Sequence, residues 1–536
     1  MAVMPKPWRL PSKVKDGWSW LCIVAALQYI AWCSLLGFHL PGLEYDEAIS
    51  MRGAMEMCVH QPRTTFSPEL SFCVGDHCAR LMVAPYVGAA KDYFLLPIFW
   101  LFGPSVAVGR FGAALIVALA ILGIAFFIRH IFGGPVSAVS ALILAVHPAM
   151  IDLPLYDNGN VALTFFAIGL IAVCLTFFLK RGDPASAFFL GAACGFAIWC
   201  RMNLLWLVLA AGLSAVLVLR RSLRPSLSLV VSFAAGGFFG AIPLLLYVAG
   251  SINTIGQSLS SVQWQATAWQ IISYAGPQLA ETLLSDPEHR SIWMGPAVPL
   301  WQLIFIGSVA ATSLLACLIV QHGPRHLVAW RRIIALTAIF YLLMTLASRT
   351  PVAGHHLVAL VPFVAILVCA APWQYLSSWQ WIRPLLLTAA LIYFGLAGYW
   401  NLQAAQGIRE TNGTKSWSNA VLKVSDFLQR FYPGSQVKIL DWGLAQNLYF
   451  LSETRIPVTE IFWNAPLANS SDEQERWDRI VKEGGLFLTN APSNLHFPAA
   501  TRALLNSLGR SGQKYETKVF HEKTGAVFAV LYDIPN

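Results

Sequence analysis

Long apolar stretches with very few charged residues recur along the chain as far as residue 399. A helix of about 20 apolar residues spans the hydrocarbon core of a bilayer. The pattern therefore predicts a polytopic α-helical membrane protein with about eleven transmembrane helices. The predicted helices cover residues 17–40, 106–128, 133–150, 158–179, 184–200, 203–219, 226–249, 298–320, 333–347, 356–371 and 383–399.

The pattern changes after residue 399, where apolar and polar residues mix as they do in soluble proteins. Apolar spacing predicts an amphipathic helix at 418–430, buried strands at 437–440 and 485–489, and a hairpin at 519–532. These elements together predict a C-terminal soluble α/β domain.

We therefore expect a transmembrane domain over residues 1–399 and an α/β domain over residues 400–536. Two outer loops of the transmembrane domain, residues 41–105 and 250–297, are long enough to contribute to a site outside the bilayer.

Composition excludes several classes of protein. Apolar residues make up 57% of the chain and charged residues only 12%, and the mean hydropathy is +0.59. Soluble domains contain about one quarter charged residues, so an ordinary soluble enzyme is excluded, as are collagen-like, disordered and small disulfide-rich proteins. The net charge of +9 is explained by topology, so no nucleic-acid partner is expected.

The distribution of basic residues predicts the orientation. One set of connections, together with the N-terminus, carries fourteen basic residues but only two acids, Asp16 and Asp183. Because Lys and Arg accumulate on the cytoplasmic side, the N-terminus is predicted to be cytoplasmic. An odd number of spans then places the C-terminal domain outside, in the periplasm if the protein lies in a bacterial inner membrane. The fourteen are Lys6, Arg9, Lys13, Lys15, Arg129, Lys180, Arg181, Arg220, Arg221, Arg224, Arg325, Arg331, Arg332 and Arg383.

Three cysteines lie in the first outer loop: Cys58, Cys73 and Cys78. In an oxidising compartment they predict one disulfide and one remaining thiol. The alternative is a zinc site that also uses neighbouring polar residues. Those residues are His60, Asp76 and His77.

Acidic residues follow the first predicted span at Glu44, Asp46 and Glu47, and Asp157 precedes a later span at a similar depth. A carboxylate at the outer membrane surface is placed where a general base could meet a lipid headgroup. Two simpler interpretations are open: the first group could be solvated loop acids, and Asp157 could be a helix N-cap.

Basic residues also occur on this outer side, where topology does not explain them. Charges near a bilayer are costly and usually face a cavity or a partner, and Arg and Lys are suited to bind phosphate oxygens. Taken singly, each could instead be a structural ion pair or a snorkelling side chain. The residues are Arg52, Lys91, Arg110, Arg201, Arg349, His355 and His356.

The order of these features resembles the GT-C glycosyltransferases, in the branch that contains protein O-mannosyltransferases and the lipid A aminoarabinose transferase. The resemblance covers roughly residues 17–400. It departs from the usual pattern where Asp92-Tyr93 follows the lysine in place of a proline, and where the late segment has His in place of Tyr or Lys. The matching features are Asp46-Glu47 with Arg52, Lys91 ahead of residues 93–102, Gly109-Arg110, His147-Pro148, Asp157, and the late Arg349, His355, His356 and Pro362.

The resemblance implies an enzyme that transfers a monosaccharide, a hexose or a pentose, from a polyprenyl-phosphate carrier to an acceptor in the cell envelope. The acceptor is lipid A or lipopolysaccharide, another glycan, or a protein. Asp46 is then the expected general base, Asp157 orients the acceptor or Asp46, and Glu47 binds the donor sugar or a metal. The reaction inverts the anomeric centre, and no cofactor is expected, a divalent metal being improbable.

The same resemblance and the positions of the cations assign the donor phosphate to Arg52, Lys91, Arg201, Arg349, His355 and His356.

Two rival hypotheses are a membrane transporter or flippase and a non-catalytic scaffold for glycan assembly. Asp441-Trp442-Gly443 and Gln446-Asn447 follow a predicted strand in the C-terminal domain. That domain could recognise the acceptor, act as a lid or serve as a docking platform.

Overall fold

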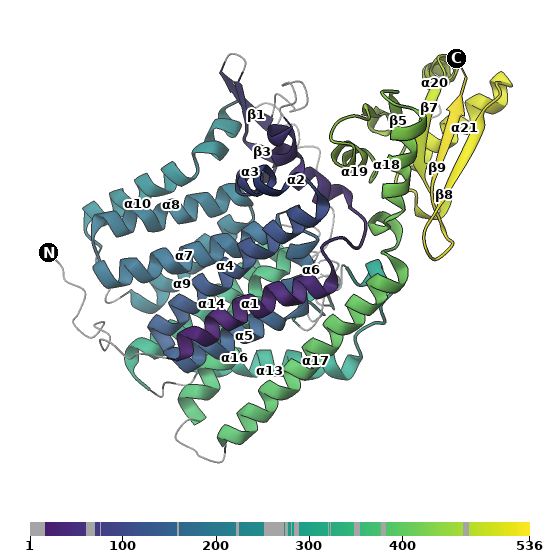
Figure 1. Ribbon diagram of the computed structural model, residues 1–536. Coiled ribbons are helices and arrows are strands. Elements are labelled where there is room, and N and C mark those ends of the chain that lie inside the picture. The colour runs from purple at the N-terminus through teal and green to yellow at the C-terminus, as the bar shows by residue number, and fades with distance from the viewer. Residues whose placement is uncertain are drawn as a thin grey trace.

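The computed structural model describes most of the chain and comprises a helical body and a C-terminal region built on a β-sheet (Figure 1). The described residues are 17–535 apart from 60–69, 75–76, 158–159, 221–224, 251–272, 274–276, 280, 284–288, 320, 322, 348–353, 377–381 and 465–470.

Every one of the eleven apolar ranges coincides with helical segments. Five helices of the described chain are long and apolar enough to cross a membrane, or up to seven if each bent pair is one span. The multi-pass architecture is therefore supported, and the number eleven stays a prediction. The helices are α1 (Trp18–Leu36), α4 (Val106–Phe132), α5 (Gly134–Val146), α6 (Pro148–Leu155), α7 (Val161–Arg181), α8 (Pro184–Cys200), α9 (Leu204–Leu219), α10 (Leu227–Gly240), Ile242–Gly250, α13 (Leu300–Ile319), α14 (Arg325–Ala347), α15 (Gly354–Leu357), α16 (Val361–Leu376) and α17 (Ile382–Thr411).

Local sequence explains where these helices begin and end. Ser105 caps α4 by accepting a hydrogen bond from the Val108 N–H, and Gly133 ends the helix with a φ of +93°. A serine cap and a C-terminal glycine are common helix boundaries. His147-Pro148 separates α5 from α6, which bend by 54° relative to each other. The bend directs the end of α6, and Asp157 after it, toward the outer-loop residues.

The segment between α1 and α4, predicted to be the first outer loop, contains α2 (Tyr45–Cys58), α3 (Ala90–Phe102) and two small hairpins, β1 (Ser71–Val74) with β2 (His77–Arg80) and β3 (Met82–Ala84) with β4 (Val87–Gly88). Cys73 is disulfide-bonded and lies opposite Cys78 in the strand register, while Cys58 is a free thiol.

This matches the predicted combination of one disulfide and one thiol. A disulfide-bonded Cys73 has no thiolate to offer a metal, which argues against the alternative zinc site. His60 and Asp76 lie outside the described residues.

The C-terminal region contains a five-stranded sheet of order β6-β5-β7-β9-β8. β5 is parallel to both β6 and β7, and β9 is antiparallel to β7 and β8. The predicted helix, strands and hairpin are found at the expected positions, and α17 continues past residue 400 into this region (Figure 1). The elements are α18 (Ala420–Phe431), β5 (Val437–Ile439), α19 (Ala445–Leu451), β6 (Val458–Glu460), α20 (Ser471–Lys482), β7 (Gly485–Asn490), α21 (Pro498–Ser511), β8 (Glu516–His521) and β9 (Val527–Ile534).

Candidate active site at the outer ends of the helices

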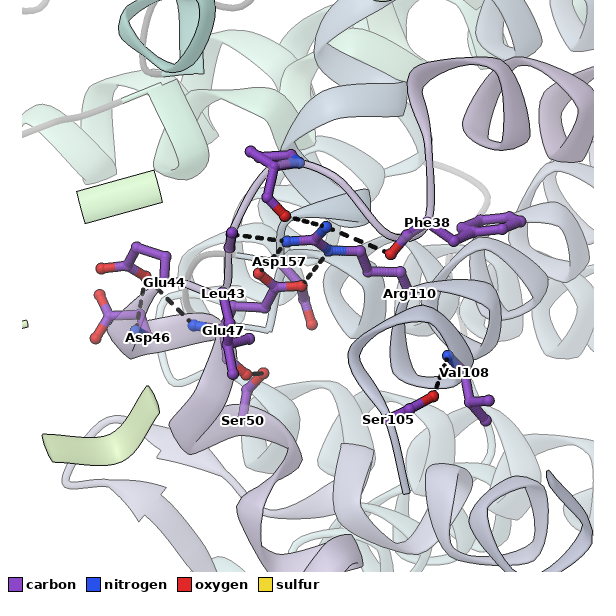
Figure 2. A network of polar contacts seen from close by, with 12 residues as sticks. Phe38, Leu43, Glu44, Asp46, Glu47, Ser50, Ser105, Val108, Arg110 and Asp157 are labelled. Atoms are coloured by element: carbon purple, nitrogen blue, oxygen red, sulfur yellow. Dashed lines mark hydrogen bonds and ion pairs between the residues drawn. The ribbon is translucent and has the colours of Figure 1, made fainter. Parts of the chain in front are cut away.

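A buried ion pair fixes the loop that follows α1. Arg110 on α4 binds Glu47 through two hydrogen bonds, Nε to Oε1 at 2.6 Å and Nη2 to Oε2 at 2.8 Å. The same guanidinium donates to the carbonyls of Pro41 at 2.9 Å and Gly42 at 3.1 Å (Figure 2). Both side chains are 1% exposed or less. Glu47, predicted to bind sugar or metal, therefore has both oxygens engaged in holding the loop in place.

Asp46 is the partly exposed acid of the three, since Glu44 and Glu47 are buried. Glu44 caps α2 by accepting hydrogen bonds from the main-chain N–H groups of Asp46 and Glu47. Burial raises the pKa of the Glu44 carboxyl well above its ordinary value, and the negative charge of Asp46 adds to the shift. The cap and the Arg110 pair together fix the start of α2, with Asp46 on its first turn.

Lys91 and Asp157 form a second fully buried ion pair. The Lys91 ammonium contacts a carboxylate oxygen of Asp157 and donates to the Ser50 hydroxyl at 2.9 Å. The other Asp157 oxygen accepts a hydrogen bond from the Ala162 N–H at 2.9 Å. Asp157 therefore holds the first turn of α7, although the N-cap residue of this helix is Asn160, and it also binds one of the cations assigned to phosphate.

The backbone around Asp157 is strained. Asp157 has a φ of +30° and Asn160 a φ of +59°, a region that L-residues rarely adopt. Asn160 is fully buried and donates to the Gly88 carbonyl at 2.8 Å, which ties this turn to β4. Strained backbone of this kind tends to cluster at functional sites, where the surrounding structure maintains it.

Arg201 and the two histidines meet beside β4, where Val87 pairs with Arg201. Arg201, which is 2% exposed, donates to the His355 carbonyl at 2.9 Å, and the rings of His355 and His356 are 4.0 Å apart. Tyr86, in the turn between β3 and β4, lies beside this group, because its carbonyl accepts a hydrogen bond from the Met202 N–H at 3.1 Å. Arg349 lies outside the described residues.

Arg52 makes its contacts elsewhere. Its guanidinium donates to Glu56 at 2.7 Å and to Gln446 at 2.9 Å, and it lies 4.1 Å from the centre of the Tyr449 ring. Residues two positions apart on a helix do not share a face, so Arg52 and Ser50 point in different directions. Arg52 joins α2 to α19, and the structure does not bring it together with Lys91.

A third buried ion pair, between Asp92 and Arg80, connects α3 to α2. Asp92 on α3 binds Arg80 at 3.2 Å and accepts a hydrogen bond from the Ala54 N–H at 3.2 Å. Gly53 makes this approach possible, because a Cβ there would lie 2.2 Å from an Asp92 carboxylate oxygen. Burial raises the pKa of Asp92 to about 6, although the Arg80 charge lowers it.

An apolar cavity of about 620 Å³ lies among α5, α13, α16 and α17. It extends along α5 from Pro135 to His147, a distance of roughly 18 Å at 1.5 Å per helical residue. Val361 lines its wall six residues after His355, so the cavity begins on the order of 10 Å from the histidine pair. Within the described part of the chain, His147 Nδ1 and the Tyr393 hydroxyl are buried there without a hydrogen-bond partner.

The described part of the chain contains no group of three or more His, Cys, Asp or Glu side chains arranged to hold a metal ion. Glu47, the residue considered for a metal, is bound to Arg110 instead.

Sequence reasoning did not find Ser50 or Tyr86. Ser50 is one small polar residue in a helix, and Tyr86 lies in a turn between strands of two and three residues, so neither produces a recognisable pattern. The contacts of Ser50 with Lys91, and of Tyr86 with Met202 next to Arg201, are visible only in the folded chain.

The chain folds as a multi-span helical body with acids and buried cations gathered at one end, followed by a C-terminal mixed sheet, and this fold is similar to that of solved membrane glycosyltransferases. The resemblance inferred from sequence is confirmed at this level by the following comparisons. Residues 89–247 match the sequence profile of a family described as dolichyl-phosphate-mannose-protein mannosyltransferase.

Among solved structures, ArnT from Cupriavidus metallidurans bound to undecaprenyl phosphate is similar with a TM-score of 0.57 and 12% sequence identity, over 97% of this chain and 98% of ArnT. The Archaeoglobus fulgidus oligosaccharyltransferase has a TM-score of 0.56 and 12% identity, over 97% of this chain and 75% of its own. The arabinofuranosyltransferase AftD from Mycobacteria has a TM-score of 0.54 and 15% identity, over 98% of this chain and 40% of its own. The search of curated protein sequences finds no match.

Proposed function

We propose that the protein is an inverting glycosyltransferase that moves a monosaccharide from a polyprenyl-phosphate carrier to an envelope acceptor on the periplasmic face of a bacterial inner membrane. The observation that carries the proposal is the position of Asp46. It is the partly exposed carboxylate on the first turn of α2, and its neighbours Glu44 and Glu47 are buried in contacts that hold that turn. The likeness to ArnT, which binds undecaprenyl phosphate, supports the carrier class.

The reaction follows from this arrangement. The acceptor hydroxyl gives its proton to the Asp46 carboxylate while its oxygen forms a bond to the anomeric carbon. The bond from that carbon to the phosphate oxygen breaks, and its electron pair leaves with the polyprenyl phosphate. A single displacement inverts the anomeric centre without a covalent enzyme intermediate.

Negative charge grows on the leaving phosphate, and cations fixed in advance lower that barrier. We assign this role to Lys91, Arg201 and the His355-His356 pair, with Arg349 a candidate from sequence. Lys91 is bound to Asp157 in the free protein, so the donor phosphate would share this lysine with Asp157. Glu47 and Arg110 are assigned a positioning role.

The apolar cavity among α5, α13, α16 and α17 is assigned to the hydrocarbon chain of the donor. Its apolar lining, which follows α5 from Pro135 to His147, suits a lipid chain, and one lining residue, Val361, lies six residues after His355.

Mass spectrometry of envelope glycolipids, glycans and periplasmic proteins tests the proposal. Cells lacking the gene are complemented with wild type, Asp46→Asn or the matched control Asp426→Asn, an exposed acid on α18. We expect one sugar mass to be missing in the deletion strain and with Asp46→Asn, and restored by wild type and Asp426→Asn. Full restoration by Asp46→Asn at normal abundance would overturn the assignment of the base. Identical spectra from all strains would favour a transporter or scaffold.

A further inference from the structure

The C-terminal sheet turns one edge toward the candidate active site. β5, β6 and β7 are parallel, so their carboxyl ends lie at the same edge. β5 lies between β6 and β7. The chain runs from β5 to β6 on one side, and it then returns past β5 to form β7 on the other side. Such a point of reversal, at the carboxyl ends of the strands, is where open α/β sheets bind ligands.

Direct contacts join this edge to the loop that carries Asp46. The Tyr45 hydroxyl donates to Glu460, the last residue of β6, at 2.9 Å, and its ring centre lies 4.9 Å from that of Trp442, which follows β5. Asn447 on α19 donates to the Leu43 carbonyl at 2.6 Å. Tyr45 immediately precedes Asp46, so the edge of the sheet begins one residue from the proposed base.

Buried hydrogen bonds hold the residues of this edge in place. Asp441, which is fully buried, accepts hydrogen bonds from the Asn490 side chain at 2.8 Å and from the main-chain N–H groups of His496 and Phe497. One carboxylate thus ties the end of β7 and the loop after it to the end of β5. The surface is fixed before any ligand arrives, which lowers the entropic cost of binding.

Aromatic rings are exposed on this fixed surface. Trp463 is 58% exposed, and its ring centre is 5.3 Å from that of Phe497. The Trp463 Nε1–H donates to Glu460 at 2.6 Å, which fixes the plane of the indole. His496 is also exposed and lies edge-on to Trp442, with ring centres 5.2 Å apart.

We infer that this edge, defined by Trp442, Glu460, Trp463, His496 and Phe497, binds the saccharide part of the acceptor and presents one of its hydroxyls to Asp46. A sugar ring has an apolar C–H face that packs on a flat aromatic ring, and hydroxyls that bond to carboxylate, amide and imidazole groups. The edge combines both kinds of group, and the exposed His496 imidazole beside the rings can bond to a sugar hydroxyl but not to a hydrocarbon chain. The inference rests on the proposed function and narrows it, because it selects a glycan or the sugar part of a glycolipid as acceptor.

Binding of full-length protein in nanodiscs to an array tests this inference without requiring catalysis. The array carries oligosaccharides that contain glucose, galactose, mannose, heptose or N-acetylglucosamine, together with Ser/Thr-rich peptides. We expect wild type to retain at least one oligosaccharide. Trp463→Ala should lower its apparent affinity by up to about tenfold, the upper end of the range expected for loss of one aromatic stacking contact. Trp463→Phe should retain most of the binding.

Phe431→Ala is the matched control, since this aromatic residue is 59% exposed on α18 of the same region. Equal binding by Trp463→Ala and wild type, or no oligosaccharide retained by wild type, would overturn the inference. Trp463-dependent binding of peptides alone would replace it with a protein acceptor. The two readouts separate the proposals: the array tests the sugar-binding edge without catalysis, and the activity of Asp46→Asn in cells tests the proposed base independently.

Discussion

Glu47 and Arg110 form a buried, doubly hydrogen-bonded pair that connects α2 to α4, and the same arginine holds two carbonyls of the loop before α2. The residues are 63 positions apart in the chain. The proposed base, Asp46, is therefore placed by a contact between elements and not by the loop alone. The pair therefore has a positioning role, which can be tested by variants that leave Asp46 itself unchanged.

Replacement of Arg110 by Lys should impair both folding and sugar transfer. Lysine keeps the charge but not the planar fork, so it loses the second bond to Glu47 and the contacts with the carbonyls. Breaking a buried pair costs on the order of 3–5 kcal/mol, and the milder change to Lys should lie at or below that range. Thermal unfolding in detergent and the envelope sugar assay measure the two effects. Arg181→Lys, at the exposed end of α7, should change neither. Normal stability and normal transfer in Arg110→Lys would contradict the positioning role.

Lys91 has two roles in our proposal, and a double variant separates them. Lys91→Ala alone leaves the Asp157 carboxylate buried without its cation, so we expect low stability, a loss of on the order of 3–5 kcal/mol. In Lys91→Ala/Asp157→Asn the buried charge is gone, and much of the stability should return. Affinity for undecaprenyl phosphate, measured in nanodiscs, should nevertheless stay at least about tenfold below wild type, because the phosphate has lost a cation. Restored affinity in the double variant would mean that Lys91 serves only Asp157.

The helices could be predicted from sequence because apolar stretches and capping residues act locally. All eleven apolar ranges coincide with helical segments, and the helix at 418–430 and the hairpin at 519–532 fall on α18 and on β8–β9. Whether each helix crosses the bilayer depends on its tilt and neighbours, which hydropathy alone does not specify.

The candidate site could be predicted only as a set of residues. Charge, position along the chain and the family resemblance point to Lys91, Asp157, Arg201 and His355, but the partners of these residues depend on how distant segments pack. Arg52 shows the limit most clearly. Its sequence position near Asp46 suggested phosphate, whereas the docking of α19 against α2 directs it to Gln446 and Tyr449.

Filling the apolar cavity should weaken use of the lipid-linked donor. Ala310 lines the cavity from α13, so Ala310→Trp would occupy space assigned to the hydrocarbon chain. We expect the apparent KM for a long-chain polyprenyl-phosphate sugar to rise at least about tenfold, with less effect on a short-chain analogue that does not reach the cavity. Leu315→Trp is the control, because Leu315 lies on the same helix but is 56% exposed on its outer surface. Equal effects of the two variants, or no effect on the long-chain donor, would remove the cavity from the proposal.

Asp92 should make stability depend on pH in a direction opposite to that of an ordinary surface ion pair. Its pKa is raised to about 6 in the folded protein, so between about pH 4 and pH 6 the folded state binds more protons than the unfolded state. Stability should therefore fall as the pH rises through this interval, by on the order of 3 kcal/mol, and become level above it.

Asp92→Asn removes the titrating group, so the stability of this variant should not fall between pH 4 and pH 6. Loss of the ion pair with Arg80 should add a cost that does not change with pH. Unfolding in detergent between pH 4 and pH 8 gives the difference between wild type and variant, and Asp426→Asn, which alters an exposed acid, controls for general effects of charge. A difference that is flat across the interval, or that grows in favour of wild type as the pH rises, would show that the Arg80 charge outweighs burial at Asp92. In that case Asp92 and Arg80 would form an ordinary ion pair, and protonation of Asp92 in acid would destabilise the folded protein instead of stabilising it.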